Sequence, residues 1–366
     1  MEHPSSPLSR STASTAKRPR TPKILVVGSL NMDYCWSVPK LPQPGETTTS
    51  TSFHMYPGGK GRNQAMAAAI VSQYRVEGKV VPYPSTEPVE VEMVGCIGKD
   101  AVGTELISAM EAVGIDTSRI ITDPEIDTGK ANIYVDNAGE NTIVLLKGAN
   151  YKLKAACIEN VMSLSLPGLL LLQCEIPVET VLYLIEKAKN QGVTVILNAA
   201  PVVPHIPTKI FKFIDHLLVN RVEAEDLNQG SKFEQQQMAS ANTVDKATLK
   251  VHYLSVCESL LIRGAKNVVI TLGADGGVAG TQTTGGKRQC TTFDAEPGKE
   301  GVVDTTGCGD TFTGAYAVEV IRQRDHRSFN MFRAVAWASK AAGISVGHFG
   351  ATSGIPWGDE LGLPDE

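Results

Sequence analysis

Short apolar runs that end in glycine or a polar residue recur along the chain, and helical stretches alternate with them. The runs have the length of buried strands and occupy residues 24–28, 92–97, 169–173, 193–197, 216–219 and 268–272. Helical stretches are expected at residues 65–70, 100–113, 178–191, 208–213 and 311–323. Strands that alternate with helices form a parallel sheet with helices on both faces. The pattern therefore predicts an α/β fold built on a mostly parallel sheet.

Residues 34–56 depart from this pattern because they are extended and are broken by Pro39, Pro42 and Pro44. Strand-like runs return at residues 131–135 and 142–146, on either side of a turn-rich connection. These pieces alternate in polarity, which predicts a small β-sheet lid formed by about residues 34–56 and 127–147. A flap over an active site and a dimer face are both consistent with such a sheet.

The first 22 residues are rich in Ser, Thr and Pro and carry Arg10, Lys17, Arg18 and Arg20. Such a segment cannot build an apolar core, so we expect a disordered tail over residues 1–22 and a single folded domain over residues 23–366. A transit peptide is the alternative, because the tail is basic and poor in acids. Its prolines oppose the amphipathic helix that a transit peptide needs. A second polar stretch, residues 229–250, predicts an insertion or an exposed helix.

Composition and charge exclude several classes of protein. The 366 residues include 34 Lys and Arg and 39 Asp and Glu, for a net charge of −5. The basic residues are spread along the chain, so neither a nucleic acid nor a membrane is expected as a partner. The seven cysteines form no C-x-x-C pair, which indicates reduced thiols rather than a zinc site or disulfides. We therefore expect a cytoplasmic protein, and the tail leaves a nuclear or organellar location open.

A glycine-rich turn precedes the helical stretch at residues 311–323. Gly307 and Gly309 let the backbone pass close to a ligand, and the first N–H groups of the helix point into the turn. The turn therefore predicts an anion site suited to a phosphate group. Asp310 is unusual in such a site, and it suggests a base that accepts a hydroxyl proton during phosphoryl transfer. A helix N-cap is the alternative role of Asp310.

Polar residues lie where several predicted strands leave the sheet. Glu175, Asn198, Asn220 and Thr271 each end or follow an apolar run, and together they predict a polar cleft along one edge. Glu223 lies one helical turn beyond Asn220, where it could reach a metal or its waters or could cap the helix.

Asn31 and Asp33 are spaced to point the same way from an extended segment. This spacing suits two hydroxyls of a polyol, and a turn is the alternative interpretation.

Two familiar nucleotide motifs are absent. Lys60 follows a Gly-Gly pair, but Gly61 stands where a P-loop requires Ser or Thr. The glycines at 307 and 309 lack the third glycine of a dinucleotide-binding turn. Neither a P-loop NTPase nor a dinucleotide-dependent dehydrogenase is therefore supported.

Four motifs carry a resemblance to a known family. They are Asn31-Met32-Asp33, the segment 58–65 (GGKGRNQA), the segment 304–310 (DTTGCGD), and Asn220-Arg221-Val222-Glu223. With them the chain resembles the PfkB family of carbohydrate kinases over about residues 23–357. The resemblance implies a Rossmann-like three-layer α/β/α fold with a β lid that also forms the dimer contact.

The resemblance implies a role for each matching residue. Asp310 matches the catalytic base, and the backbone anion hole for the transferred phosphoryl group matches Gly307, Cys308 and Gly309. The positions that match sugar contacts are Asn31, Asp33, Gly59, Lys60, Asn63 and Glu175, together with Asp310. The positions that match nucleotide contacts are Asn198, Asn220, Thr271, Leu272, Gly273, Ala274, Asp275, Gly276, Gly309 and Ser339, with Glu223 as the acid near Mg²⁺ and the phosphates. The loop pair that holds a monovalent cation, normally K⁺, matches Asp304, Thr306, Ser345, His348, Gly350 and Gly354.

Two positions depart from the family pattern. Ser339 stands where an Asn near the adenine is usual, so the base contact is expected to differ. Gly354 stands where a serine that helps to hold the cation is expected, and the neighbouring Ser353 could substitute. The Cys308 thiol is expected to be incidental, because no suitable base lies near it in the sequence.

These matches predict an ATP-dependent kinase that phosphorylates D-ribose at O5, giving D-ribose 5-phosphate and ADP, with Mg²⁺ and K⁺. The expected partners are D-ribose, ATP and a second copy of the chain. Two alternatives stay open: a PfkB kinase for deoxyribose, a hexose or a nucleoside, and a catalytically silent regulator that binds a sugar or a nucleotide. A silent regulator would be recognised by loss of the base or the anion hole, and both are present.

Overall fold

The computed structural model describes most of the 366 residues. The described ranges are 22–76, 79–82, 88–159, 167–203, 206–228, 245–283, 285–298, 301–324 and 329–362. The predicted tail, apart from its last residue, and most of the predicted insertion at residues 229–250 lie outside them. Within the described part of the chain, no helix combines the length and the apolar character needed to cross a membrane.

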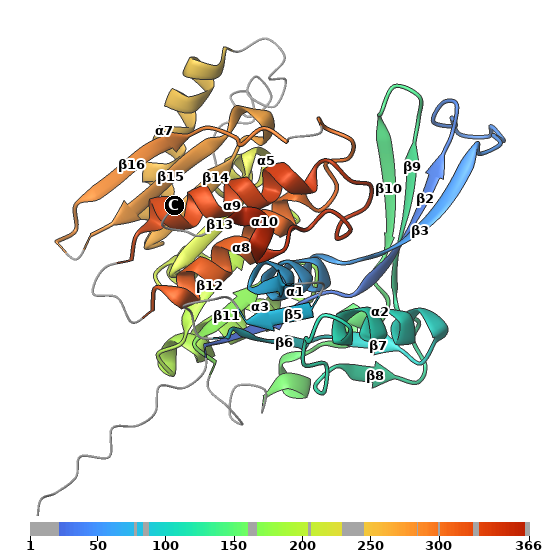
Figure 1. The fold of residues 1–366 in the computed structure, drawn as a ribbon, viewed down its shortest axis with the longest axis horizontal. Coiled ribbons are helices and arrows are strands. Elements are labelled where there is room, and N and C mark those ends of the chain that lie inside the picture. Colours follow the sequence, from blue (N-terminus) through green and yellow to red (C-terminus); the bar gives the residue numbers. More distant parts are fainter. Residues whose placement is uncertain are drawn as a thin grey trace, which may run out of the picture.

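An eight-stranded sheet runs through the molecule in the order β16-β15-β14-β13-β12-β11-β1-β6 (Figure 1). Its strands are β1 (Lys23–Val27), β6 (Glu90–Val94), β11 (Leu169–Leu172), β12 (Thr194–Asn198), β13 (His216–Asn220), β14 (Asn267–Thr271), β15 (Gly277–Gln282) and β16 (Arg288–Phe293). The six strands from β14 to β6 are parallel, and β15 and β16 are antiparallel to their neighbours. The mostly parallel sheet is therefore confirmed.

Helices cover both faces of this sheet, because alternate side chains of the strands are apolar on both sides. From β1, Ile24 and Val26 pack into one core cluster, and Leu25 and Val27 pack into the other. The first cluster is covered by α1 (Lys60–Val71), α2 (Ala101–Glu111), α8 (Cys308–Arg322), α9 (Met331–Ser345) and α10 (Gly358–Leu361). The second is covered by α3 (Val178–Asn190), α4 (Thr208–Phe211), α5 (Arg221–Asn228), α7 (Lys246–Ile262) and the short 3-10 helices η1 (Gly148–Lys152) and η2 (Ala155–Ile158). The fold is thus the predicted three-layer α/β/α arrangement.

A separate four-stranded sheet projects from one side of this body (Figure 1). It has the order β10-β9-β2-β3, formed by β2 (Asn31–Ser37), β3 (Ser52–Gly58), β9 (Gly129–Val135) and β10 (Asn141–Leu146). β2 pairs with β9 in parallel and with β3 in antiparallel register. This is the predicted lid, and its strands begin at Asn31 rather than at residue 34.

Three details of the predicted elements are wrong. The single strand expected over residues 92–97 is divided, because β6 ends at Val94 and β7 (Cys96–Gly98) pairs with β8 (Ile121–Asp123) outside the main sheet. A hairpin of β4 (Gln73–Val76) and β5 (Lys79–Pro82) lies between the helical stretch at residues 65–70 and the run at residues 92–97, where the pattern indicates no strand. Helix α8 begins three residues earlier than the pattern indicates, at Cys308.

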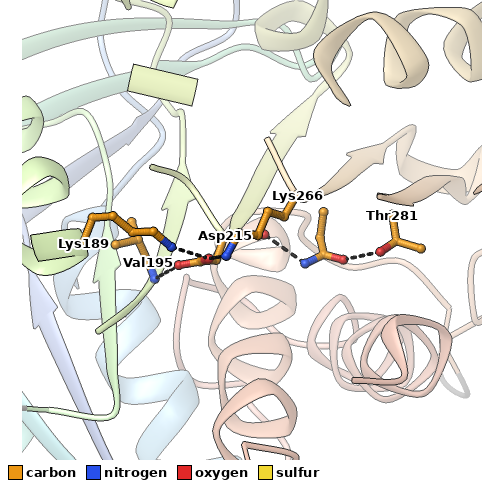
Figure 2. A network of polar contacts seen from close by, with 6 residues as sticks. Lys189, Val195, Asp215, Lys266 and Thr281 are labelled. Carbon is orange, nitrogen blue, oxygen red and sulfur yellow. Dashed lines mark hydrogen bonds and ion pairs between the residues drawn. The ribbon is translucent and has the colours of Figure 1, made fainter. Parts of the chain in front are cut away.

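A polar network closes the edge of the sheet at which β13 begins (Figure 2). Asp215 accepts hydrogen bonds from the Val195 amide (3.0 Å), Lys266 Nζ (2.5 Å) and Lys189 Nζ (3.2 Å). Burial by itself would raise the pKa of Asp215, but these hydrogen bonds and the two lysine charges hold it below its usual range. The acid therefore stabilises the fold in its ionised form, and it links α3, β12 and the start of β14.

Helices α1 and α8 lie against each other over small residues. A Cβ atom at Gly314 would lie 2.5 Å from Ala67 Cβ and 2.7 Å from the Gln64 carbonyl oxygen. Such distances require the two backbones to approach as closely as only glycine allows. The contact therefore places the first turn of α1 beside the first turns of α8.

We expect Gly314→Ala to lower the free energy of unfolding by roughly 1–3 kcal/mol, the usual effect of an overpacked core. Alanine is a better helix former than glycine, so helix propensity alone would raise stability. A loss of stability would therefore report the forced separation of α1 and α8. Urea unfolding checks this, with Gly285→Ala as control because a Cβ at Gly285 would meet no atom within 4 Å. Equal stability of the Gly314 variant and the wild type would contradict the proposed close contact.

Candidate active site

Gly307 begins helix α8 and turns the chain into it. It is the N-cap, with φ 74° and ψ 0°, and a Cβ there would collide with the Ala351 carbonyl oxygen. The first hydrogen bond of the helix runs from the Thr311 N–H to the Gly307 carbonyl at 2.8 Å. Asp310 is therefore the third residue of the helix, and its predicted alternative role as an N-cap is wrong.

The Asp310 carboxylate instead faces helix α1. It is only 7% exposed, and it accepts from Asn63 Nδ2 at 3.1 Å and from Gln64 Nε2 at 2.9 Å. Amide N–H groups can only donate, so both contacts present donors to the carboxylate oxygens. The close packing of α1 and α8 thus supplies an acceptor at the glycine turn that is held from two sides.

The amides of the glycine turn are not all available to a ligand. The Cys308 N–H donates to the Thr305 carbonyl at 3.2 Å, within the turn itself. Gly309 is exposed, and no atom lies within 4 Å of the place where its Cβ would stand. The fit of a phosphate group is therefore best at Gly309, where the helix N-terminus is open.

The Cys308 side chain does not have the properties of a nucleophile. Burial raises the pKa of its thiol, and Sγ lies 3.8 Å from the Ala342 carbonyl oxygen. A reactive cysteine needs a lowered pKa. The observation supports an incidental role for this side chain.

The residues predicted to contact a sugar lie at the junction of the lid and the main sheet. The Glu175 carboxylate accepts from Ser29 Oγ at 2.6 Å and from the Lys60 amide at 3.0 Å. Asn31 Oδ1 accepts from Asn150 Nδ2 at 2.8 Å. Asn31 lies in strand β2, so the alternative of a turn at this position is wrong.

Asp33 is the most perturbed acid of the group. Burial raises its pKa to about 7, and the nearby carboxylates of Glu175 and Asp310 act in the same direction. Arg62 and Lys60 oppose the rise without cancelling it. Asp33 and Asp310, from strand β2 and helix α8, therefore belong to one electrostatically coupled cluster.

Lys60 is the cation at the centre of this cluster. Its burial lowers the pKa of the ammonium group, but the surrounding Asp310, Glu175, Glu223 and Asp33 outweigh this and raise it. The lysine is thus charged at neutral pH, and it faces the residues predicted for the sugar, the base and the metal. Tertiary structure brings these predicted groups together.

On the nucleotide side, Asn220 and Glu223 bond to each other across the start of α5. Glu223 accepts from the Asn220 amide at 2.8 Å and from Asn220 Nδ2 at 2.9 Å, and Asn220 Oδ1 accepts from the Glu223 amide at 3.0 Å. The predicted capping role is therefore present. Burial raises the pKa of Glu223 in spite of the bond from Asn220. Its role toward Mg²⁺ remains a prediction.

The other predicted nucleotide positions follow neighbouring strands. Thr271 lies opposite Asn220 in the register of β13 and β14, and η4 (Gly273–Asp275) follows after Leu272. Asn198 ends β12, but its side chain bonds to Gln64 and to the Leu218 carbonyl. Ser339 is buried in α9. The amide of Asn198 is thus engaged within the protein, beside the Asp310 network.

Asp304 joins the two loops predicted to hold a monovalent cation. Its carboxylate accepts from the Thr306 amide at 2.9 Å and from the Gly350 amide at 2.8 Å. A Cβ at Gly354 would lie 2.5 Å from the Ser345 carbonyl oxygen and 3.0 Å from His348 Cβ. Glycine at 354 therefore reflects crowding, and a serine there would not fit without a shift.

The hydroxyl of Ser353, the predicted substitute, donates to the Phe349 carbonyl oxygen. The Asp304 carboxylate and backbone carbonyl groups would offer oxygen ligands, which are the ligands that a hard cation prefers. No group of three or more His, Cys, Asp or Glu side chains in the described ranges is arranged to hold a metal.

Five buried or partly buried residues belong to this site although the sequence did not assign them a role. They are Ser29, Arg62, Gln64, Asn150 and Gln173, each with a hydrogen bond to a predicted residue or to another member of this set. Arg62 and Gln64 lie inside the glycine-rich segment 58–65, and Gln173 ends a predicted strand. The positions of these three residues in the sequence could therefore have indicated that they belong to the site. Nothing in the sequence marks Asn150.

Comparison with known proteins gives a family model and relatives over most of the chain. The model of the pfkB family carbohydrate kinase matches residues 21–358. The ribokinase of Haemophilus influenzae is 33% identical over 336 residues, which cover 91% of this chain and 95% of that protein. The deoxyribokinase of Salmonella typhi is 29% identical, covering 91% of this chain and 95% of its own.

Solved structures share the arrangement described above. The ribokinase of Thermotoga maritima gives a TM-score of 0.72 at 31% identity, covering 93% of this chain and 98% of that chain. The ribokinase of Arabidopsis thaliana, solved in complex with ribose and ATP, gives a TM-score of 0.71 at 26% identity, covering 93% and 97%. The predicted fold class is confirmed by these similarities.

We expect Asp33→Asn to stabilise the ligand-free protein at pH 8 by roughly 4 kcal/mol, the free energy that corresponds to a pKa difference of about three units. The folded-state pKa of about 7 is raised, so the protonated acid contributes stability that is fully present below its unfolded pKa of about 3.9. That contribution is lost as the pH rises through 7. Urea unfolding between pH 5 and pH 8 checks this. The same pH dependence in wild type and variant would contradict the raised pKa.

Proposed function

The chain belongs to the pfkB family of carbohydrate kinases, and from this premise we propose that it transfers the γ-phosphoryl group of ATP to O5 of D-ribose. The products are D-ribose 5-phosphate and ADP. One observation carries the proposal: the Asp310 carboxylate at the glycine turn bonds to Asn63, which lies in the same short segment as Lys60. An acceptor for a hydroxyl proton, an open helix N-terminus and a cation thus share one polar site.

Asp310 is the general base of this mechanism. Its ionised carboxylate is held by the amides of Asn63 and Gln64, and it accepts the proton of the 5-hydroxyl as the oxygen attacks phosphorus. The new O–P bond forms as the bond from the γ-phosphorus to its bridging oxygen breaks, and ADP leaves with the electron pair. Holding base and hydroxyl together makes the transfer effectively unimolecular.

The start of α8 stabilises the transferred group. The Gly309 N–H and the helix dipole favour the negative charge that the phosphoryl oxygens carry. Bound Mg²⁺ would neutralise phosphate charge, with Glu223 near it, and ATP would lie against the loop at residues 271–276 and the strand ends of β12 and β13. K⁺ would lie between the Asp304 loop and residues 345–354.

The sugar site mixes donors with acceptors. Asp33 and Glu175 supply carboxylates, Asn31 and Asn63 supply amides, and Lys60 supplies an ammonium group. Hydroxyls both donate and accept, so this set suits a small polyol better than a nucleoside, whose base requires an apolar or stacking surface. D-Ribose is therefore preferred over a nucleoside, and deoxyribose is the nearest competitor because a deoxyribokinase is among the relatives.

A second copy of the chain is the proposed partner of the lid. The lid carries exposed apolar side chains on β3 and β10, namely Phe53, Met55, Ile143, Val144, Leu145 and Leu146. A cluster of this kind marks an interaction surface. We place the homodimer in the cytoplasm, in keeping with seven cysteines that are all free thiols.

Replacement of the base should strongly reduce turnover while leaving sugar binding. We expect Asp310→Ala to lower kcat by roughly 10²–10⁴-fold, the usual contribution of a positioned base. ADP release with ribose and ATP measures turnover, and calorimetric titration measures ribose affinity. The matched control is Asp226→Ala, at an exposed acid of α5. Near-normal turnover of the Asp310 variant would remove this residue from the mechanism.

Rates over a panel of acceptors test the substrate. We expect kcat/KM to be highest for D-ribose among ribose, 2-deoxyribose, fructose and adenosine, and to fall when K⁺ is replaced by Na⁺. Asp304→Asn should reduce the response to K⁺, because Asp304 links the two loops through Thr306 and Gly350. Turnover of adenosine alone would contradict the proposal, and the absence of any phosphoryl transfer would favour a silent regulator.

A further inference from the structure

We propose that Gln64 and Gln173 are positioning residues: Gln64 presents an N–H donor to the Asp310 carboxylate and orients it, and Gln173 holds the Gln64 amide in place. The inference rests on the proposed function, in which Asp310 is the base. It concerns two side chains that need not touch substrate. Neither has a role in the steps described above beyond the contact from Gln64.

The orientation begins at a backbone carbonyl. Asn198 Nδ2 donates to the Leu218 carbonyl oxygen at 3.1 Å. A carbonyl oxygen accepts and never donates, so the nitrogen of the Asn198 amide has to face it. The oxygen of Asn198 is thereby turned toward Gln64.

Gln64 is oriented in turn by Asn198. Its Nε2 lies 2.9 Å from Asn198 Oδ1 and 2.9 Å from Asp310 Oδ1, so both N–H groups of this amide have an oxygen acceptor. Rotating the amide by half a turn would place its oxygen against two other oxygens. The Leu218 carbonyl therefore fixes the orientation of the Asn198 amide, and Asn198 fixes that of the Gln64 amide. As a result, Asp310 faces the nitrogen of Gln64 rather than its oxygen.

Gln173 completes the chain on the opposite side. Its Nε2 donates to Gln64 Oε1 at 2.6 Å, the only remaining polar atom of that amide. The chain of donors thus runs from Gln173 in the segment after β11, through Gln64 in α1, to Asp310 in α8. The orientation of Gln64 is set by Asn198, and the donor from Gln173 supports that orientation.

Burial of these two glutamine side chains lowers the stability of the fold. Both are 0% exposed, and Gln173 Oε1 has no hydrogen-bond partner in the described structure. Gly28 leaves the space for this oxygen, since a Cβ there would collide with it. A buried amide with an unsatisfied oxygen destabilises a core, so stability alone does not account for Gln173. Such local conflicts are typical of functional sites.

The surrounding charges explain why Asp310 needs these donors. The carboxylates of Asp33 and Glu223 repel the Asp310 carboxylate, and the ammonium group of Lys60 attracts it. The half-buried Cys308 thiol is the other titratable group beside it. Gln64 and Asn63 supply N–H donors to this carboxylate without adding a further charge to the cluster.

Two variants test the chain through kinetics. Gln64→Glu places a carboxylate against Asp310, and we expect the acid limb of the kcat/KM profile to move about one pH unit upward, as for carboxylates that share a site. Gln173→Leu removes the donor to Gln64, and we expect kcat to fall about tenfold, as for other residues that orient a reacting group. The ribose KM should change little, and the melting temperature should stay level or rise, because an unsatisfied oxygen is removed. Gln191→Glu, at the exposed C-cap of α3, is the matched control with an unchanged profile.

The outcomes separate this inference from the proposed function. If Asp310→Ala is inactive but Gln64→Glu keeps the wild-type pH profile and Gln173→Leu keeps the wild-type kcat, the positioning role is wrong and the base stands. If Gln173→Leu lowers the melting temperature and leaves kcat unchanged, Gln173 is structural only. If Asp310→Ala remains active, the proposed function itself fails.

Discussion

The close approach of helices α1 and α8 is the constraint on which the site depends. Gly314 lets α8 lie against Ala67 and the Gln64 backbone, and this brings Asn63 and Gln64 within hydrogen-bond distance of Asp310. The glycine turn that precedes α8 is then fixed as well, because Gly307 packs on Ala351. A carboxylate on a rigid helix and its amide donors on a second helix hold their geometry better than loop residues could.

Charge is distributed unequally between the two edges of the main sheet. At the edge where β13 begins, Asp215 has two lysine partners and a backbone donor, and its ionised form stabilises the fold. At the opposite edge, acids crowd around Lys60, and burial raises the pKa of Asp33 to about 7. An unstable charge arrangement at one edge is tolerated because the rest of the fold supports it. This is the expected balance in a protein whose binding edge is selected for chemistry.

Much of the fold and of the site could be predicted from residue order. Strand-end residues such as Asn198 and Asn220 lie at one edge because parallel strands all end there. Lid strands were recognisable from alternating polarity and from a turn-rich connection. The division of residues 92–97 between two sheets was not predictable, because the apolar pattern is continuous across Gly95. The second half, β7, leaves the main sheet because it pairs with β8, which lies more than 20 residues later in the chain.

The sequence by itself determined the identity and order of the chemical groups: a glycine turn with an acid, a lysine after paired glycines, and polar residues after apolar runs. Tertiary structure decided what those groups do to one another. Gly307 rather than Asp310 is the N-cap of α8, and the Asp310 oxygens accept from Asn63 and Gln64, which lie 247 and 246 residues earlier. Gln173 and Asn150 act over separations of 109 and 119 residues. Amide orientation and acid pKa depend on such distant neighbours, and a local pattern carries no information about them.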